Sequence, residues 1–250
     1  MSLNSLGAII IAKNEEADLP GCLSNLKGWV EEIVVVTDAL SSDKTETIAR
    51  EQGCKTIRRA FDSYAAQKQA ALDLCTTEWV LSIDADERVS PKLRDEILLF
   101  LKNPEKIDGI ILRFRVEFMG RVLKFGGMGH EKHLRLFRRS KGRFIGGLIH
   151  EGIQISGPTA LRFSGFMEHK PYQNLREYLD KMFFYLELSS QKARQAGKRF
   201  HVWHHLILPW EMVSRLFLKL GILDGNAGII WAALSSFHHW LKYVKLKEGE

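Results

Sequence analysis

Short apolar runs alternate with segments of helical periodicity along the first hundred residues of the chain. The runs are rich in β-branched and other apolar residues, and they predict buried strands at 6–12, 32–37, 55–58 and 79–83. The segments that follow these runs predict helices at 15–27, 43–52, 65–74 and 90–101. Because strands that alternate with helices of this length form βαβ units, we expect an α/β fold, with a mostly parallel, Rossmann-like sheet and helices on both faces.

The pattern changes after Asp108. Further strands are expected at 109–118, 131–137 and 143–149, where glycines interrupt the apolar runs. From about Leu175 the apolar spacing is helical to the end of the chain. We therefore expect an α/β domain at residues 1–172 and a helical C-terminal region at residues 173–250.

Four clusters of polar residues directly follow predicted strands. They are Lys13–Glu16, Asp38 with the turn Ser41–Thr45, Asp84–Glu87, and His150 with Glu151. The carboxyl ends of parallel strands meet at one edge of a sheet, so the first three clusters should converge there. In open α/β sheets, ligands bind beyond that edge. The sequence thus predicts one ligand site built from three loops.

The cluster after the strand at 79–83 has the chemistry of a metal site. One residue separates Asp84 from Asp86, so their side chains leave the strand end in the same direction. Mg²⁺ and Mn²⁺ prefer one or two carboxylates and complete their shells with phosphate oxygens and water. The pair therefore suits a cation that carries a diphosphate. The alternative is a solvated turn in which Asp86 caps a helix.

Asp38 and the serines after it allow two interpretations. As an acidic residue after the second strand, Asp38 is suited to accept hydrogen bonds from a base or a ribose. The alternative is an ordinary acidic residue at a strand end. In either case we expect Ser41 or Ser42 to cap the helix that follows. The acids of the Lys13–Glu16 segment likewise suit the positive N-terminus of a helix.

The charge balance indicates an anionic partner. The 250 residues carry a formal net charge of +6, and residues 113–143 contain ten Lys and Arg against two acids. Such a stretch is either a solvated face or a surface that binds phosphate groups. The sequence has no helix-turn-helix or RNP pattern, so we expect no nucleic-acid partner. Three scattered cysteines outside any CxxC pattern indicate a reducing, cytoplasmic compartment.

Several motifs, in one order and at one spacing, resemble the family 2 glycosyltransferases of GT-A fold. They are the Lys13–Glu16 loop, TDALSSDKT at 37–45, the helix with Gln67–Leu72, and WVLSIDADERVS at 79–90. Three later motifs are similar to one branch of that family, the lipopolysaccharide-core heptose β-1,4-glucosyltransferases. They are His133–Arg139, Ile149–Glu151 and Leu223–Gly228.

The resemblance implies a role for each matched residue. The positions expected to hold the donor nucleotide are Ala12, Asn14, Glu15, Asp38, Gln67, Lys68, Asp84 and Ala85. The resemblance also implies a Mg²⁺ or Mn²⁺ cofactor on Asp86, assisted by Asp84, and makes Glu151 the general base. Asp86 and Glu151 are thus the expected catalytic residues. One departure is Leu40, where the family has glycine. Leucine is poorly tolerated at positive φ, so we expect a different turn there.

The function that the resemblance implies is inverting glycosyl transfer. A hexose, expected to be glucose, would move from a UDP-sugar to a heptose of a lipid-anchored lipopolysaccharide core. Such an acceptor implies a cytoplasmic enzyme that is peripheral to the inner membrane. One alternative is a polyprenyl-phosphate glycosyltransferase, which needs no base because a lipid phosphate is already ionised. The alternative from a different class is a non-catalytic nucleotide-sugar-binding protein.

The helical C-terminal region is amphipathic and rich in tryptophan. Trp203, Trp210, Trp231 and Trp240 lie among Leu, Ile and Phe residues, and lysines follow at the end of the second helix. These features suit an interfacial helix on an anionic leaflet. They suit equally well a helix that packs on the first domain, or on a second copy of the chain in a homo-oligomer.

Overall fold

The computed structural model describes residues 4–129, 131–146 and 151–249, which fall into two compact units. The first unit contains residues 1–114 and 132–169, and the second contains residues 115–131 and 170–250. Residues 115–131 thus belong to the helical unit, whereas the sequence placed them with the α/β domain. The partition into domains at residues 172 and 173 remains a prediction.

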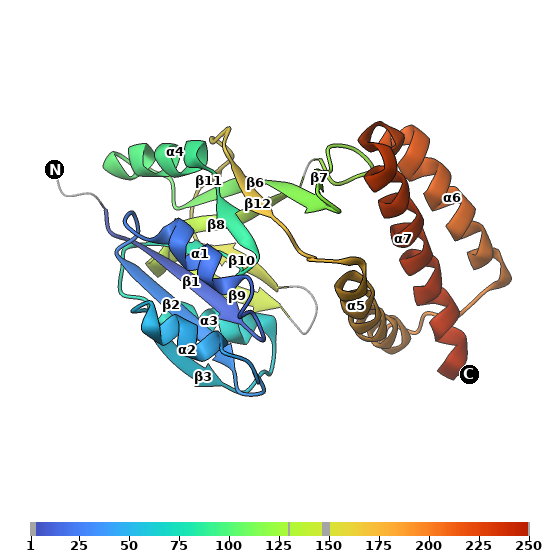
Figure 1. Ribbon diagram of the computed structural model, residues 1–250, viewed down its shortest axis with the longest axis horizontal. Coiled ribbons are helices and arrows are strands. Elements are labelled where there is room, and N and C mark those ends of the chain that lie inside the picture. The colour runs from blue at the N-terminus through green and yellow to red at the C-terminus, as the bar shows by residue number, and fades with distance from the viewer. Residues whose placement is uncertain (1–3, 130, 147–150, 250) are drawn as a thin grey trace. The chain divides into compact units, whose positions relative to one another are not determined.

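A mixed sheet of ten strands dominates the described residues (Figure 1). Its strands are β1 (Leu6–Ala12), β2 (Glu32–Asp38), β3 (Lys55–Arg59), β4 (Trp79–Ser82), β5 (Glu87–Val89), β6 (Gly109–Phe118), β7 (Arg121–Val122), β8 (Lys132–Arg138), β11 (Thr159–Ala160) and β12 (Phe166–His169). The order is β3-β2-β1-β4-β8-β6-β12-β5, with β7 and β11 paired to β6. Because β1, β2, β3 and β4 are mutually parallel, their carboxyl ends and the predicted loops lie at one edge. The expected α/β fold is confirmed.

Helices cover both faces of this sheet, as the sequence predicted. One face carries α1 (Leu19–Leu26), α2 (Thr45–Glu51) and α4 (Pro91–Lys102); the other carries α3 (Tyr64–Leu74) and the antiparallel pair β9 (Gly142–Gly146) and β10 (Glu151–Ile155). Successive residues of β1 point to opposite faces. Ala8 and Ile10 pack in the apolar core under α1, α2 and α4, and Ile9 packs in the core under α3. A strand buried on both faces needs a continuous apolar sequence, which explains the run LGAIIIA.

Local signals decide where two of these helices begin. The Ser90 hydroxyl caps α4, the helix expected at 90–101, by accepting a hydrogen bond from the Leu93 N–H. The start of α1 is Leu19 rather than the expected Glu15. Asn14 has a positive φ of 55°, so the chain turns after β1 before the helix forms. Pro20 then fixes φ in the first turn of α1, where its missing N–H costs no hydrogen bond.

The second unit is mainly helical, as expected from Leu175 onward. Its helices are α5 (Leu175–Gln195), α6 (Ile207–Val213) and α7 (Gly225–Val244), with a 3-10 turn at Val202–Leu206 before α6 and a π-helical turn at Ser214–Leu218 after it. Phe118, Tyr178 and Trp231 pack edge to face in its core, with ring centroids 5.4–6.0 Å apart. Aromatic packing therefore ties residues 115–131 to α5 and α7.

The Leu223–Gly228 motif forms the sharp entry to α7. Asp224 is buried, and its Oδ2 accepts hydrogen bonds from the backbone N–H groups of residues 124 and 125 at 3.0 and 2.8 Å. A Cβ on Gly228 would lie 2.0 Å from the carbonyl oxygen of Gly221, so only glycine fits at this position. The motif therefore has a structural role, because it joins the start of α7 to residues 115–131 of the second unit.

Candidate functional site

Hydrogen bonds join the loop after β1 to the loop after β2. The Asn14 Oδ1 accepts a hydrogen bond from the Ser42 N–H at 2.9 Å, and the Asn14 N–H donates to the Ser41 Oγ at 2.9 Å. The Glu15 N–H donates to the Thr45 Oγ1 at 2.7 Å. Asn14 and Glu15, both expected to hold the donor nucleotide, therefore lie in a loop that is fixed against the β2–α2 turn.

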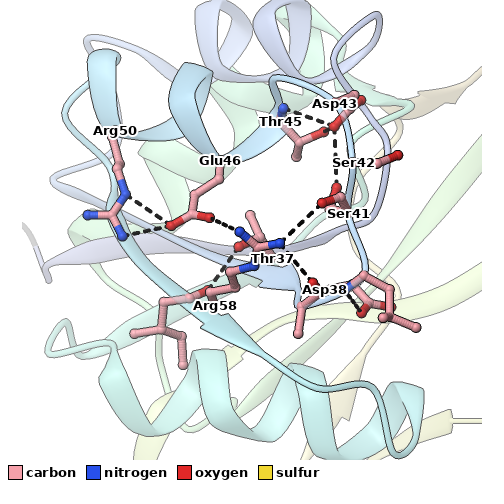
Figure 2. A network of polar contacts seen from close by, with 12 residues as sticks. Thr37, Asp38, Ser41, Ser42, Asp43, Thr45, Glu46, Arg50 and Arg58 are labelled. Atoms are coloured by element: carbon pink, nitrogen blue, oxygen red, sulfur yellow. Dashed lines mark hydrogen bonds and ion pairs between the residues drawn. The ribbon is translucent and has the colours of Figure 1, made fainter.

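The first turn of α2 is bound by Asp43, although the sequence favoured Ser41 or Ser42 (Figure 2). The Asp43 Oδ1 accepts hydrogen bonds from the N–H and the hydroxyl of Thr45 at 3.0 and 2.5 Å, and Oδ2 accepts one from the Glu16 N–H at 2.9 Å. Burial favours the neutral acid, but these hydrogen bonds outweigh it and hold the pKa of Asp43 below its usual value. The prediction of a serine cap is wrong because a carboxylate can accept from both loops at once.

The turn after β2 is held without a glycine. Leu40 does not adopt a positive φ, and its N–H donates to the Asp38 Oδ1 at 2.8 Å. Arg58 of β3 lies beside this turn (Figure 2) and donates to the carbonyl oxygens of Ala39 and Ser41 at 2.8 and 3.3 Å. The aspartate and the arginine thus fix a turn in which leucine is not strained.

Two buried oxygens near the ends of β2 and β3 accept no hydrogen bond within the described residues. The Asp38 Oδ2 lies 3.3 Å from the Lys13 Nζ without such a bond, and the Gln67 Oε1 is also unsatisfied. The Gln67 Nε2 donates to the carbonyl oxygens of Arg59 and Ala60 at 3.3 and 3.2 Å, and Arg59 is the register partner of Asp38. Unsatisfied buried acceptors are costly, so these two oxygens are candidates to receive N–H or O–H groups of a ligand.

Asp84 lies in a cluster of charges just beyond β4. Its Oδ1 is 3.0 Å from the Lys68 Nζ, and its Oδ2 is 3.0 Å from the Arg135 guanidinium. Arg135 also contacts the Oε1 of buried Glu87 at 2.8 Å. Burial disfavours the ionised form of Asp84, but the two cations outweigh burial and hold its pKa well below the usual range. For Glu87 burial prevails over Arg135 and raises the pKa to about 7. The structure thus brings Lys68 and Asp84, two expected nucleotide-binding residues, into contact.

His169, at the end of β12, faces Asp86 and was missed in the sequence. Its Nε2 lies 3.5 Å from the Asp86 Oδ2, and its Nδ1 is buried with no hydrogen-bond partner in the described residues. β12 pairs with β5 so that His169 is opposite Glu87. Burial disfavours charge on His169, but the Asp86 hydrogen bond and the charges of Asp86, Glu87 and Asp84 outweigh it and raise the pKa to about 9. The neighbouring carboxylates therefore favour the charged form of His169.

The residues around Asp86 fit a divalent cation. A carboxylate suits Mg²⁺ or Mn²⁺, and an imidazole suits transition metals. In the part of the chain that the structure describes, no group of three or more His, Cys, Asp or Glu side chains could hold a metal alone. Two protein ligands suffice for a cation that takes its other ligands from a diphosphate and water. Because both Asp84 oxygens already contact cations, Asp86 with His169 is the better-placed ligand pair.

Three further residues were expected at this site. Ala12 is the buried last residue of β1, and Ala85 is buried with its carbonyl oxygen accepting a hydrogen bond from Arg88 at 2.8 Å. Glu151 begins β10, but its side chain and all of His150 lie outside the described residues. The role of Glu151 as the general base stays a prediction.

Two arginines of the basic stretch at 113–143 make ion pairs within the protein. Arg135 binds the carboxylates beyond β4, as described above. Arg138 pairs with Glu78 and lies 3.3 Å from the Asp108 carboxylate, and its guanidinium stacks over the Trp79 ring at 4.8 Å from the centroid. The stretch is therefore not one continuous solvated or phosphate-binding face.

Comparisons with known proteins agree with this fold and these motifs. The model of the family described as glycosyl transferase family 2 matches residues 8–169. The lipopolysaccharide core biosynthesis glycosyltransferase LpsC of Rhizobium meliloti (strain 1021) is 29% identical over 248 residues, which cover 96% of this chain and 91% of LpsC. An uncharacterized glycosyltransferase of Rickettsia typhi is 25% identical over an alignment of 258 positions, which covers 98% of this chain and 88% of the relative.

A solved structure has the same fold over nearly the whole chain. The mannosyltransferase PcManGT from Pyrobaculum calidifontis, determined in complex with GDP-Man and Mn²⁺, matches with a TM-score of 0.50 and 14% identity. The match covers 98% of this chain and 74% of the mannosyltransferase. At this level of identity the likeness is one of fold alone.

Proposed function

The chain belongs to glycosyl transferase family 2, and on that premise we propose that it is a metal-dependent, inverting hexosyltransferase of lipopolysaccharide core assembly. The donor is a UDP-sugar, UDP-glucose in our proposal, and the acceptor is a heptose of the core. The name of the relative LpsC, a lipopolysaccharide core biosynthesis glycosyltransferase, supports the acceptor class. The motifs at His133–Arg139, Ile149–Glu151 and Leu223–Gly228 support the same branch.

One observation carries this proposal: Asp86 faces His169 directly beside the ion cluster of Asp84. Lys68 and Arg135 neutralise Asp84, whereas in the described part of the chain the ion-pair partner of Asp86 is the His169 imidazole 3.5 Å away. This arrangement leaves Asp86 and His169 to bind Mg²⁺ or Mn²⁺ together with the donor diphosphate. When bound, the cation would neutralise the negative charge that develops on the departing UDP.

The nucleoside of the donor belongs at the neighbouring strand ends. The Asp38 Oδ2 and the Gln67 Oε1 are buried acceptors, and a uracil N–H and the ribose hydroxyls are the donors that would satisfy them. The hydrogen-bonded loop with Asn14 and Glu15 would close over the same part of the nucleotide. A preformed loop of this kind lowers the entropic cost of binding.

Glu151 is proposed as the general base. It would take the proton of the acceptor hydroxyl as that oxygen attacks C1 of the sugar, while the bond from C1 to the UDP oxygen breaks and the electron pair leaves with UDP. A single displacement inverts the anomeric centre, so an α-linked donor gives a β-linked product. The position of Glu151 at the start of β10 comes from the backbone, and its role comes from the resemblance to the family.

The acceptor class also implies a location. A heptose acceptor of this class is lipid-anchored, and we propose that the enzyme meets it as a peripheral protein on the cytoplasmic face of the inner membrane. Large apolar side chains exposed on the second unit support this location.

Release of UDP and transfer of sugar test the function together. UDP-glucose, UDP-galactose and UDP-N-acetylglucosamine are each incubated with Mn²⁺ and either a heptose-terminated core oligosaccharide or a polyprenyl phosphate. We expect UDP release with UDP-glucose that depends on the core acceptor. Transfer to polyprenyl phosphate instead would replace this proposal by the rival enzyme. UDP-sugar binding without release on any acceptor would indicate a binding protein.

A further inference from the structure

A row of large apolar side chains lies exposed on the helical segment 202–218 of the second unit. Trp203, Leu206, Trp210, Val213 and Phe217 are spaced three and four residues apart, which places them on one side of a helical segment. Their exposed fractions run from 46% for Val213 to 69% for Leu206. We call these five residues the outer face. Exposing such side chains to water is unfavourable in proportion to their area.

The charged side chains of the same segment point the other way, into the unit. Glu211 and Arg215 are only 19% and 20% exposed, and their ion pair measures 3.1 Å. The Glu211 Oε1 also lies 3.2 Å from the His239 Nδ1 of α7, and Arg215 donates to the Gly126 carbonyl oxygen at 3.3 Å. A surface helix in water has the opposite arrangement, with its polar side outward and its apolar side inward. The outward side of the segment is therefore suited to contact an apolar medium rather than water.

The charges that flank the outer face have a single sign. Lys198 and Arg199 precede the segment, Lys219 follows it, and all three are exposed. Glu211 is the only acid between residues 196 and 222, and it is paired inside the unit. Tryptophan at an apolar face with flanking lysine and arginine is typical of a helix that lies in the interface of an anionic bilayer. A second copy of the chain would bring the same cations toward each other.

The other two tryptophans of this region have internal partners. Trp231 packs against Phe118 and Tyr178, and the Trp240 Nε1 donates to the His205 Nδ1 at 3.2 Å. The apolar side of α7 contributes Ile230 and Leu234 to the core of the unit. Among the described residues, none of the helices has both the length and the apolar composition needed to cross a bilayer.

We propose that the outer face inserts into the interfacial layer of a membrane that contains anionic lipids, so that segment 202–218 lies on the bilayer. Trp203, Trp210 and Phe217 enter the boundary between headgroups and acyl chains, and the flanking cations contact lipid phosphates. This inference deepens the proposed function and rests on the peripheral location proposed there, because it assigns the membrane attachment to one surface of the second unit.

Vesicle binding of the full chain tests this inference. Sedimentation with vesicles of phosphatidylglycerol and phosphatidylcholine should show binding, and vesicles of phosphatidylcholine alone should bind several-fold more weakly. The double variant Trp210→Ser/Phe217→Ser should bind the mixed vesicles at least about tenfold more weakly, because two aromatic side chains no longer enter the bilayer. The control Leu99→Ser, which removes a 68%-exposed side chain from α4 of the first unit, should bind as the wild type does.

Fluorescence quenching locates the inserted residues with a variant that keeps the fold. Brominated phosphatidylcholine in the vesicles should quench the wild-type tryptophan emission, and Trp203→Phe/Trp210→Phe should lose most of this quenching while it still binds. Quenching that persists in the Phe variant would overturn the assignment of these residues. So would wild-type binding by the Ser variant, or a wild type that binds no vesicles. A dimer that the Ser variant abolishes, without vesicle binding by the wild type, would assign the outer face to a second copy of the chain.

Discussion

Replacing Asp43 by alanine should destabilise the first unit more than any other change in the β2–α2 turn. The carboxylate accepts hydrogen bonds from the N–H and the hydroxyl of Thr45, from the Glu16 N–H and, at 3.3 Å, from the Ser41 hydroxyl. One oxygen of this carboxylate binds Thr45 at the start of α2 (Figure 2), and the other binds the loop after β1 through the Glu16 N–H. Alanine would leave these donors to water.

The size of the effect follows from the number and exposure of these bonds. Losing a carboxylate at a helix start costs about 0.5–2 kcal/mol, and a hydrogen bond to a charged group contributes about 1.5–3 kcal/mol when it is buried. Asp43 is partly exposed, so water recovers much of the loss. We therefore expect Asp43→Ala to lower the free energy of unfolding by about 2 kcal/mol, which corresponds to a fall in Tm of about 4–8 °C.

The pH dependence of this effect has a definite sign. The pKa of Asp43 is lower in the folded than in the unfolded protein, so the carboxylate stabilises the fold fully above the unfolded value, near 3.8. That stabilisation is lost as the pH falls through the folded pKa. The difference in stability between wild type and Asp43→Ala should therefore be constant from pH 8 to pH 5 and shrink below about pH 4.

Urea unfolding of wild type, Asp43→Ala and Ser42→Ala measures this difference. Ser42 is an exposed neighbour in the same turn whose hydroxyl makes one long contact, 3.5 Å to the Asn14 Oδ1, so its loss should cost less than about 0.5 kcal/mol. An Asp43→Ala variant as stable as Ser42→Ala would refute the reasoning. A stability difference that grows toward low pH would refute the stated sign.

Three further outcomes are expected from the site. Glu151→Gln should bind UDP-glucose with near-normal affinity by calorimetry but transfer the sugar at least about a hundredfold more slowly. His150→Gln should slow transfer less than Glu151→Gln does. A larger loss of transfer in His150→Gln would assign the general base to His150. Excess EDTA should stop UDP release and added Mn²⁺ should restore it; full activity in EDTA would contradict a metal-dependent reaction. Arg135→Met should lower the free energy of unfolding in urea by about 2–3 kcal/mol, because buried Glu87 and partly buried Asp84 lose a shared cation and only Asp84 retains Lys68; an unchanged midpoint would contradict this ion cluster.

The parallel half of the fold could be predicted from the sequence because its signals are local. A strand that is buried on both faces needs an unbroken apolar run, as at Leu6–Ala12, and a helix on a sheet needs apolar residues every three or four positions. Once these elements were ordered along the chain, the common edge of β1, β2 and β4 followed. Lys68 was expected near Asp84 only from the resemblance to the family, and the structure places the two in contact.

In the antiparallel half, the strands expected at 109–118 and 131–137 are confirmed as β6 and β8, but β5 and β12 could not be predicted in the same way. β5 has three residues and β12 has four, too few for a period to be recognised, and their pairing joins segments far apart in the sequence. His169 therefore carried no signal that would place it against Asp86. The position of Arg135 in the sequence likewise did not show whether its side chain would pair with Asp84 or face solvent.

Two local predictions depended on tertiary context. Ser41 and Ser42 are good helix caps by residue type, but Asp43 alone can accept hydrogen bonds from both loops. In segment 202–218 the periodicity correctly separated a polar from an apolar side. A period cannot tell which side faces inward, and here Glu211 and Arg215 face the interior of the unit.

The most direct test of the proposed function compares wild type with Asp86→Asn in one reaction. UDP release from UDP-glucose is measured in Mn²⁺ with and without a heptose-terminated core oligosaccharide, and Asp95→Asn, an exposed aspartate of α4, serves as the control. We predict acceptor-dependent release by wild type and Asp95→Asn, and a loss of at least about a hundredfold in kcat for Asp86→Asn, because a neutral amide is a far weaker ligand for the cation that stabilises the leaving diphosphate. Full activity of Asp86→Asn, or no acceptor-dependent release by the wild type, would contradict the account.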